Sequence, residues 1–285
     1  MSNETRKAGD DEDEGQSMSS SVEVATDPTT AFEVFTQEVN CWWLQGPINF
    51  HDSSQTYEKR IEPEVGGRIL EVRNLETGEG LELGRITIWE PGTRLAWDSS
   101  IDDVSTIVLF EPSANGTKVT VTARIPNGGA NNGGTSWVGV TPLWFDRWIK
   151  LRDESDHKPM VMARLALAVN YENPVKAAKW LVDTFEFVPA GRIPDDEAES
   201  MGWIEFHIGN ASLIVLGSAG GSRGDLVSHT PWVFVDDLDC QFELAKSKGA
   251  VIVQEIQTHG ARTFVSADLE GNQWTFAQAS PAMLQ

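Results

Sequence analysis

Basic residues are scarce in this chain of 285 residues, which has 22 Lys and Arg against 43 Asp and Glu and a formal net charge of −21. Nucleic acids and anionic membrane surfaces bind basic patches, so this imbalance argues against both as partners. No apolar run approaches the roughly 18 residues that a membrane-spanning helix needs. The N-terminal segment is polar and acidic, so we expect neither a secretory signal nor an Arg-rich transit peptide there.

Cysteine is also rare. Only Cys41 and Cys240 occur, far apart in the chain. They form no disulfide framework, and we predict a cytoplasmic protein. Cys41 adjoins Trp42 and Trp43, and Cys240 lies early in a predicted helix, so packing is a better interpretation of both than nucleophilic chemistry. Phosphate-binding glycine loops with a lysine and serine nucleophile elbows are absent too. The sequence therefore offers no recognisable catalytic set.

The length fits two domains rather than one. Residues 1–20 hold an acidic run and neither aromatic nor β-branched apolar residues, so we predict a disordered acidic tail. We expect the domains at 21–153 and 163–279, with a linker at 154–162 and a C-terminal tail at 280–285. With 40% hydrophobic residues and 11 Trp, the chain can fill two cores.

The first half has the pattern of a helix followed by an antiparallel sheet. Asp27 is a suitable N-cap and Pro28 a suitable first helical residue. Apolar residues then recur at helical spacing: Ala31, Phe32, Phe35 and Val39. After the helix we expect strands at 55–63, 68–74, 81–89, 94–97, 106–111 and 118–125. The last of these alternates cleanly, which is typical of a sheet with one covered face.

A glycine-rich stretch, "NGGANNGG", separates this sheet from a second helix. It is interpreted as a flexible gate or loop rather than a phosphate cradle. We predict Thr141 as the N-cap and Pro142 as the first residue of the helix, followed by an apolar stripe of Leu143, Trp144, Trp148 and Leu151. Trp144 and Trp148 then share a face toward the sheet. The result is a helix-grip arrangement with a curved antiparallel sheet.

The second half repeats a shorter plan twice. A strand at 164–171, a helix from Asn173 and strands at 201–210 and 211–218 come first. A strand at 231–237, a helix from Asp237 and strands at 251–257, 262–269 and 273–278 follow. The pattern predicts two βαβββ units, and so an α+β protein as a whole.

The motifs "VFVDDLD", "AKSKGA" and "DLEGNQWTF" in the second half resemble the vicinal-oxygen-chelate superfamily of glyoxalase I, extradiol dioxygenases and bleomycin-resistance proteins. The resemblance covers about 163–279. It implies four metal-ligand positions on strands, and here they fall near Leu165 or Ala166, within 212–217, at Thr230 and at Thr275. None of these is a ligand residue, and His229 lies one residue out of register, which in a strand is the opposite face. We therefore expect no metal and no cofactor.

Two further polar residues of that half, Glu205 and His207, share one face of a strand. Our interpretation is a surface-facing pair. His51, in a polar connector, carries no functional signal.

Three stretches of the first half, "SVEVATDPTTAFEVFTQEVNCWW", "EPEVGGRILEV" and "GRITIWEPGTRLAW", resemble the START-like (SRPBCC) superfamily, in the branch named after chaperone-ATPase activators. The resemblance covers about 21–153. It implies a hydrophobic cavity between the sheet and the last helix. The tryptophans of this half are then either core residues or cavity walls.

The function we expect is metal-independent binding of small apolar or aromatic molecules, of the glyoxalase/bleomycin-resistance type, by a homodimer. A metal-dependent lyase or dioxygenase is the first alternative, and a chaperone co-factor the second. The predicted ligand-binding residues are Trp43, Trp97, Trp144, Trp148, Trp232 and Trp274.

Overall fold

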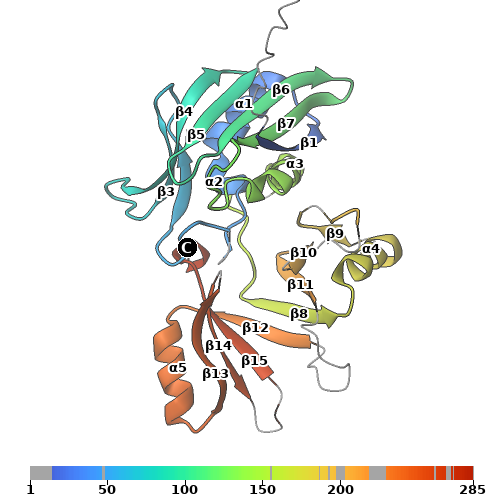
Figure 1. Ribbon diagram of the computed structural model, residues 1–285. Coiled ribbons are helices and arrows are strands. Elements are labelled where there is room, and N and C mark those ends of the chain that lie inside the picture. Colours follow the sequence, from blue (N-terminus) through green and yellow to red (C-terminus); the bar gives the residue numbers. More distant parts are fainter. Residues whose placement is uncertain are drawn as a thin grey trace, which may run out of the picture.

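The computed structural model describes residues 15–46, 49–154, 156–185, 187–191, 193–196, 203–217, 229–259, 261–267, 271 and 273–284. The fold is α+β, with one curled antiparallel sheet and one mixed sheet (Figure 1). Among the described residues no helix is long and apolar enough to cross a membrane. Residues 1–14 of the predicted tail lie outside the described residues.

The first sheet has seven strands in the order β1-β7-β6-β5-β4-β3-β2. Their bounds are β1 Gln16–Val24, β2 Glu58–Ile61, β3 Arg68–Val72, β4 Gly80–Glu90, β5 Arg94–Ser99, β6 Ser105–Ser113 and β7 Gly116–Ile125. All neighbouring pairs are antiparallel. The predicted alternation in the last strand is confirmed, because Val119, Val121, Ala123 and Ile125 are all buried.

The helices of this half are α1 (Pro28–Gln37), the short α2 (Val39–Trp42) and α3 (Thr141–Leu151), preceded by the 3-10 turn η1 (Ser136–Gly139). The Asp27 side chain caps α1 as predicted, accepting from the backbone N–H groups of Thr29 and Thr30. Ala31, Phe32 and Phe35 then turn toward the sheet and are buried. The core of this half is the space between these helices and the concave face of the sheet.

Two predictions about the second helix are wrong. Thr141 is the first residue of α3 rather than its N-cap, and its hydroxyl donates to the Trp137 carbonyl at 2.7 Å. The predicted apolar stripe is also displaced, since Leu143 and Leu151 are exposed whereas Phe145 is fully buried. Trp144 and Trp148 are buried together, as expected for positions four apart.

The second sheet has eight strands in the order β13-β14-β15-β12-β8-β11-β10-β9. The first βαβββ unit comprises β8 Leu165–Tyr171, α4 Pro174–Phe185, β9 Val188–Pro189, β10 Trp203–Ile208 and β11 Ala211–Gly217. The second comprises β12 His229–Val235, α5 Leu238–Ser247, β13 Val251–His259, β14 Ala261–Ala267 and β15 Gln273–Gln278. Both predicted units are therefore present, and they join where β12 pairs antiparallel with β8.

The two faces of this sheet have different coverings. On one face, α4 packs over Phe206 and Val215, and α5 packs over Phe264. On the other face, Ala166, Phe234 and Ala277 belong to the same buried cluster as the core of the first half. The second sheet is thus covered by its own helices on one side and meets the first half on the other.

Two segments expected to be peripheral are structured. The prediction of disorder is wrong for residues 16–20. They form the start of β1 and pair with β7. The C-terminal segment forms a 3-10 turn, η2 (Pro281–Leu284), whose Ala282 and Met283 are buried in the cluster shared by the two halves. The Ala282 N–H donates to the Thr56 carbonyl at 3.2 Å. In Figure 1 the red C-terminal turn accordingly lies beside the blue segment that leads to β2 and β3.

Trp148 provides a test of the core of the first half. Its side chain is fully buried, and its Nε1 donates to Glu38 Oε2 at 2.6 Å. Replacing Trp148 with Ala removes that ring from a filled region, so the free energy of unfolding should fall by about 3–5 kcal/mol in urea titrations. The control is Leu151→Ala on the same helix, whose side chain is 38% exposed; it should cost less than about 1 kcal/mol. Equal losses in the two variants would contradict this placement of α3.

Candidate functional site

The first half contains an interior cavity of ≈ 110 Å³ between the sheet and the helices. In another protein a cavity of about 150 Å³ holds a benzene ring, so this smaller one has room for a single ring at most without movement of its wall. Most of its wall is apolar, from aromatic residues (Phe35, Trp42, Trp43, Trp97 and Trp137) and aliphatic ones (Val39, Ile61, Ile69, Leu83, Ile101, Val104, Val121 and Val138). Such a wall suits a compact apolar ligand.

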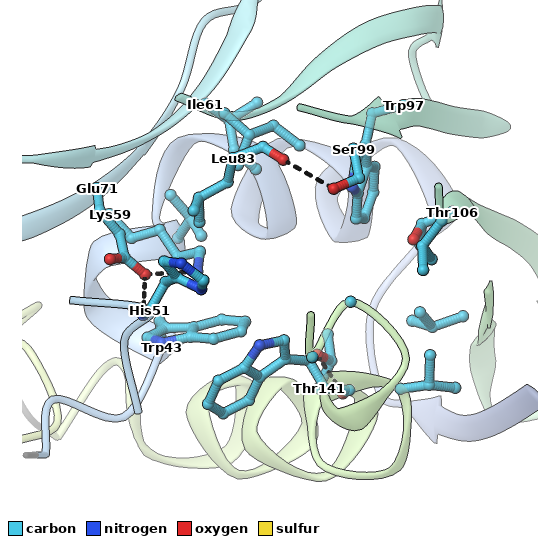
Figure 2. A pocket seen from close by; sticks show the side chains of 18 of the residues that line it. Trp43, His51, Lys59, Ile61, Glu71, Leu83, Trp97, Ser99, Thr106 and Thr141 are labelled. Carbon is cyan, nitrogen blue, oxygen red and sulfur yellow. Dashed lines mark hydrogen bonds and ion pairs between the residues drawn. The ribbon is translucent and has the colours of Figure 1, made fainter. Parts of the chain in front are cut away.

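Two of the predicted ligand-binding residues line this cavity, Trp43 and Trp97 (Figure 2). The Trp43 ring is fixed by a 2.6 Å hydrogen bond from Nε1 to the Asn49 carbonyl. Trp97 can lie against β4 because residue 84 is glycine: a Cβ there would come within 2.8 Å of Trp97 Cδ1. The Trp43 ring is therefore held in place before any ligand arrives, and Trp97 lies close against β4 beside it.

The other predicted residues lie elsewhere. Trp144 packs behind Trp43, with ring centroids 5.3 Å apart, and does not line the cavity. Trp148 lies in the filled core described above. Trp232 is partly buried against the cluster shared by the two halves. Trp274 is 37% exposed on the opposite face of the same sheet. The structure thus brings together Trp43 and Trp97 and separates Trp232 from Trp274.

A buried carboxylate forms the polar end of the cavity. Glu71 on β3 is 1% exposed, and its two oxygens accept hydrogen bonds from the backbone N–H groups of His51 (2.7 Å) and Asp52 (3.0 Å). The Thr56 hydroxyl donates a third, at 3.2 Å. These donors satisfy a group whose burial would otherwise be costly. The segment before β2 is therefore wrapped around Glu71.

Lys59 on β2 supplies the counter-charge. It is 7% exposed; its Nζ lies 3.8 Å from Glu71 Oε1 and 3.6 Å from the centroid of the Trp43 ring. Burial lowers the pKa of Lys59 to about 8, although Glu71 acts in the opposite direction. Figure 2 shows Lys59, Glu71 and His51 gathered on one side of the cavity, and Thr106 on the other. The site is therefore apolar with one ionisable corner.

The glycine-rich stretch closes part of the wall, since Asn132, Gly133 and Gly134 line the cavity. Asp102 Oδ2 accepts from the backbone N–H groups of Asn132 (2.9 Å) and Gly134 (3.1 Å). Burial raises the pKa of Asp102, but hydrogen bonds from the Ser99 side chain and from backbone N–H groups outweigh it and hold the pKa below 3.8. The predicted gate is thus held by hydrogen bonds to the ionised Asp102 carboxylate in the turn after β5, and we call this contact the latch.

Sequence reasoning missed Lys59, Glu71 and His51. A signal for Lys59 existed: it lies two residues before Ile61 on an alternating strand, so it shares the apolar face on which a lysine is out of place. Glu71 in "RILEV" is likewise a charged residue on the apolar face of its strand. His51 carried no such pattern, because it reaches the cavity from an irregular segment.

The second sheet holds a different polar cluster, and the interpretation of Glu205 and His207 as a surface pair is wrong. Their side chains are 15% and 6% exposed. Arg147 of α3 donates to His207 Nδ1 at 3.2 Å and to the Gly209 carbonyl at 2.7 Å. A guanidinium can only donate, so the proton of a neutral His207 sits on Nε2, 3.6 Å from Glu205 Oε1. This cluster joins the two halves.

The positions where metal ligands were sought can now be located. Strand register puts Ala166, Thr230 and Thr275 on one face, the face toward the first half, and puts exposed His229 on the other. Within the described residues, no three His, Cys, Asp or Glu side chains lie close enough to hold a metal ion.

The latch over the cavity can be tested by Asp102→Ala. Removing the carboxylate leaves the N–H groups of Asn132 and Gly134 without an acceptor, so their amide hydrogen exchange should accelerate by about tenfold or more. Asp98→Ala is the control, because the Asp98 side chain accepts from the Ser105 side chain at 2.7 Å and from no backbone N–H group of the described residues. In the parent protein the protection should persist at neutral pH and be lost as pH falls below 3.8, where a carboxyl of lowered pKa finally takes up its proton. Unchanged exchange in Asp102→Ala would show that another contact holds the gate.

Comparisons with known proteins show only which solved structures this chain is similar to. No family model and no curated protein sequence matches the chain. A glyoxalase/bleomycin resistance protein/dioxygenase superfamily member from Vibrio splendidus 12B01 is 13% identical over 40% of this chain and 97% of its own, with a TM-score of 0.31. An AHSA1-like protein from Aeromonas hydrophila is 15% identical over 50% of this chain and 96% of its own, with a TM-score of 0.34. TioX from Micromonospora sp. ML1 is 25% identical over 41% and 98%, with a TM-score of 0.18. The first two are of the kinds that the sequence motifs resemble.

Proposed function

We propose that this protein binds small apolar or aromatic molecules in the cavity of its first half. The observation that carries the proposal is the combination of the Trp43 and Trp97 walls with one polar corner at Lys59 and Glu71. Apolar walls supply affinity through burial, and a small number of polar groups fixes orientation. The gate latched by Asp102 is the element through which a ligand would enter.

This proposal places the binding site in the first half alone. The sequence also predicts ligand-binding residues in the second half, Trp232 and Trp274, but the sheet face that carries Thr230 and Thr275 is partly occupied. Phe234 and Ala277 on that face pack into the cluster shared with the first half, and Arg147 reaches His207 across the junction. These contacts favour a structural role for that face.

The family identities belong to the same proposal. We propose a START-like first half and a vicinal-oxygen-chelate second half, on the motifs quoted above and on the helix-and-curled-sheet and paired βαβββ arrangements. Formation of a homodimer, metal-independent binding and a cytoplasmic location stay predictions.

Binding can be measured by ¹⁹F NMR with 4-fluorotoluene, a single-ring probe without ionisable groups. We expect line broadening and a shift of the probe resonance that saturate at micromolar to millimolar concentrations, as is usual for fragment-sized ligands. A probe resonance that stays unchanged with both probe and protein at millimolar concentration would contradict the proposal.

A cavity-filling pair of variants places the site. Leu83 of β4 lines the cavity, so Leu83→Phe puts additional carbon atoms into the space and should weaken 4-fluorotoluene binding by about tenfold or more while leaving the melting temperature equal or higher. Leu81→Phe, two residues earlier on the same strand and outside the lining, is the matched control and should bind as the parent does. Loss of binding in both variants, or in neither, would place the ligand elsewhere.

A further inference from the structure

We propose that Lys59 is a reactive amine that captures small apolar aldehydes and ketones as imines inside the cavity. This inference rests on the proposed function, because it assigns a chemical class to the ligand of that same site. It adds a covalent step and a residue that carries it.

The position of the lysine nitrogen is the first argument. Lys59 Nζ has two partners among the described residues, the Glu71 carboxylate at 3.8 Å and the face of the Trp43 ring at 3.6 Å. Neither is a conventional hydrogen bond, so in the described part of the chain this 7% exposed ammonium has the face of the Trp43 ring beside it but no oxygen or nitrogen acceptor at hydrogen-bonding distance. Lys59 lines the cavity, so a ligand that enters can bring its own oxygen or carbon atom into contact with this nitrogen.

The surroundings also keep the nitrogen nucleophilic. Only an unprotonated amine adds to a carbonyl, and apolar burial disfavours the ammonium form. With the pKa of Lys59 lowered to about 8, roughly a fifth of the side chain is neutral amine at pH 7.4, against about a thousandth for a lysine at its ordinary value. Among the described residues that line the cavity, the other charged or titratable groups are Glu71 from β3 and His51 from the segment before β2.

The charges of the corner select a neutral carbonyl over a carboxylate. The Lys59 ammonium and the Glu71 carboxylate already balance one another, so a ligand carboxylate would leave an uncompensated negative charge in an apolar space. An aldehyde or ketone adds no charge. Its apolar body would lie between Trp43 and Trp97.

The reaction balances with groups present in the corner. The Nζ lone pair adds to the carbonyl carbon, forming a C–N bond, while the carbonyl oxygen takes up a proton and the nitrogen loses one. The resulting carbinolamine breaks its C–O bond and releases water, and a C=N bond forms with loss of the second N–H proton. Nothing is oxidised or reduced. Glu71 Oε1, 3.8 Å from Nζ, is a base close enough to take up the protons that the nitrogen sheds.

Reductive trapping tests the proposal directly. The protein is incubated with 4-fluorobenzaldehyde and sodium cyanoborohydride, and the modified lysines are located by peptide mass spectrometry. We expect Lys59 to be modified at least tenfold faster at pH 7.4 than exposed Lys118. The Lys59 rate should level off above about pH 8, following the pKa of its amine, whereas the Lys118 rate should keep rising. Equal rates at the two lysines would overturn the proposal.

Matched controls separate this chemistry from simple binding. Lys59→Arg keeps the positive charge but cannot form an imine, so trapping in the cavity should disappear, whereas Lys118→Arg should leave the Lys59 rate unchanged. In the parent protein, an excess of 4-fluorotoluene should slow modification of Lys59 but not of Lys118. That competition keeps the test decisive if Lys59→Arg fails to fold.

The two proposals can fail independently. 4-Fluorobenzyl alcohol has nearly the size and shape of the aldehyde but no carbonyl group. If ¹⁹F NMR shows that the alcohol binds while the aldehyde is not trapped at Lys59, the cavity binds small molecules and the imine proposal is overturned. If neither molecule binds and Lys59 is not trapped, both proposals fail.

Discussion

The concave face of the first sheet has to be covered by apolar side chains, and rigid aromatic rings from the three helices provide most of that cover. Phe32 meets Phe110 at 5.3 Å between ring centroids, and Phe35 meets Phe145 at 5.2 Å. Edge-to-face rings of this kind fix one another in position, and a packed interior resists collapse. Phe35 lines the cavity, and its contact with Phe145 opposes movement of the Phe35 ring into that space. The cavity follows from the same packing that stabilises the fold.

One ionisable corner interrupts this apolar cover, and its cost is offset locally. Glu71 takes two backbone N–H groups and a hydroxyl from the segment before β2, so the carboxylate determines how that segment folds. Among the residues that the structure describes, Lys59 receives no comparable set of partners. Its charge is met there by Glu71 at 3.8 Å and by the Trp43 ring. The asymmetry explains why the carboxylate acts as a fixed structural element while the lysine nitrogen is left available to a ligand.

Much of the fold follows from local sequence patterns, whereas the site follows from tertiary contacts. The Asp27 cap, the alternation of Val119, Val121 and Ala123, and both βαβββ units are periodic or positional signals that a single sequence carries. Periodicity could not say which of the equally apolar tryptophans face empty space: Trp43 and Trp97 line it, and Trp148, with the same local signature, fills the core. The interpretation of Glu205 and His207 failed for a related reason, since Arg147, which donates to His207, lies some sixty residues away in sequence, on α3.

The junction between the halves is connected by hydrogen bonds to two walls of the cavity. Arg147 ties α3 to the Gly209 carbonyl and to His207, and α3 begins with Thr141, a cavity-lining residue. The Ala282 N–H ties the C-terminal turn to the Thr56 carbonyl, and the Thr56 hydroxyl donates to Glu71. Hydrogen bonds therefore connect both walls to the second half. Arg147 connects α3, and Thr56 connects the polar corner at Glu71. The described residues of the second half contribute no cavity-lining side chain, yet they can still limit how far these two walls move.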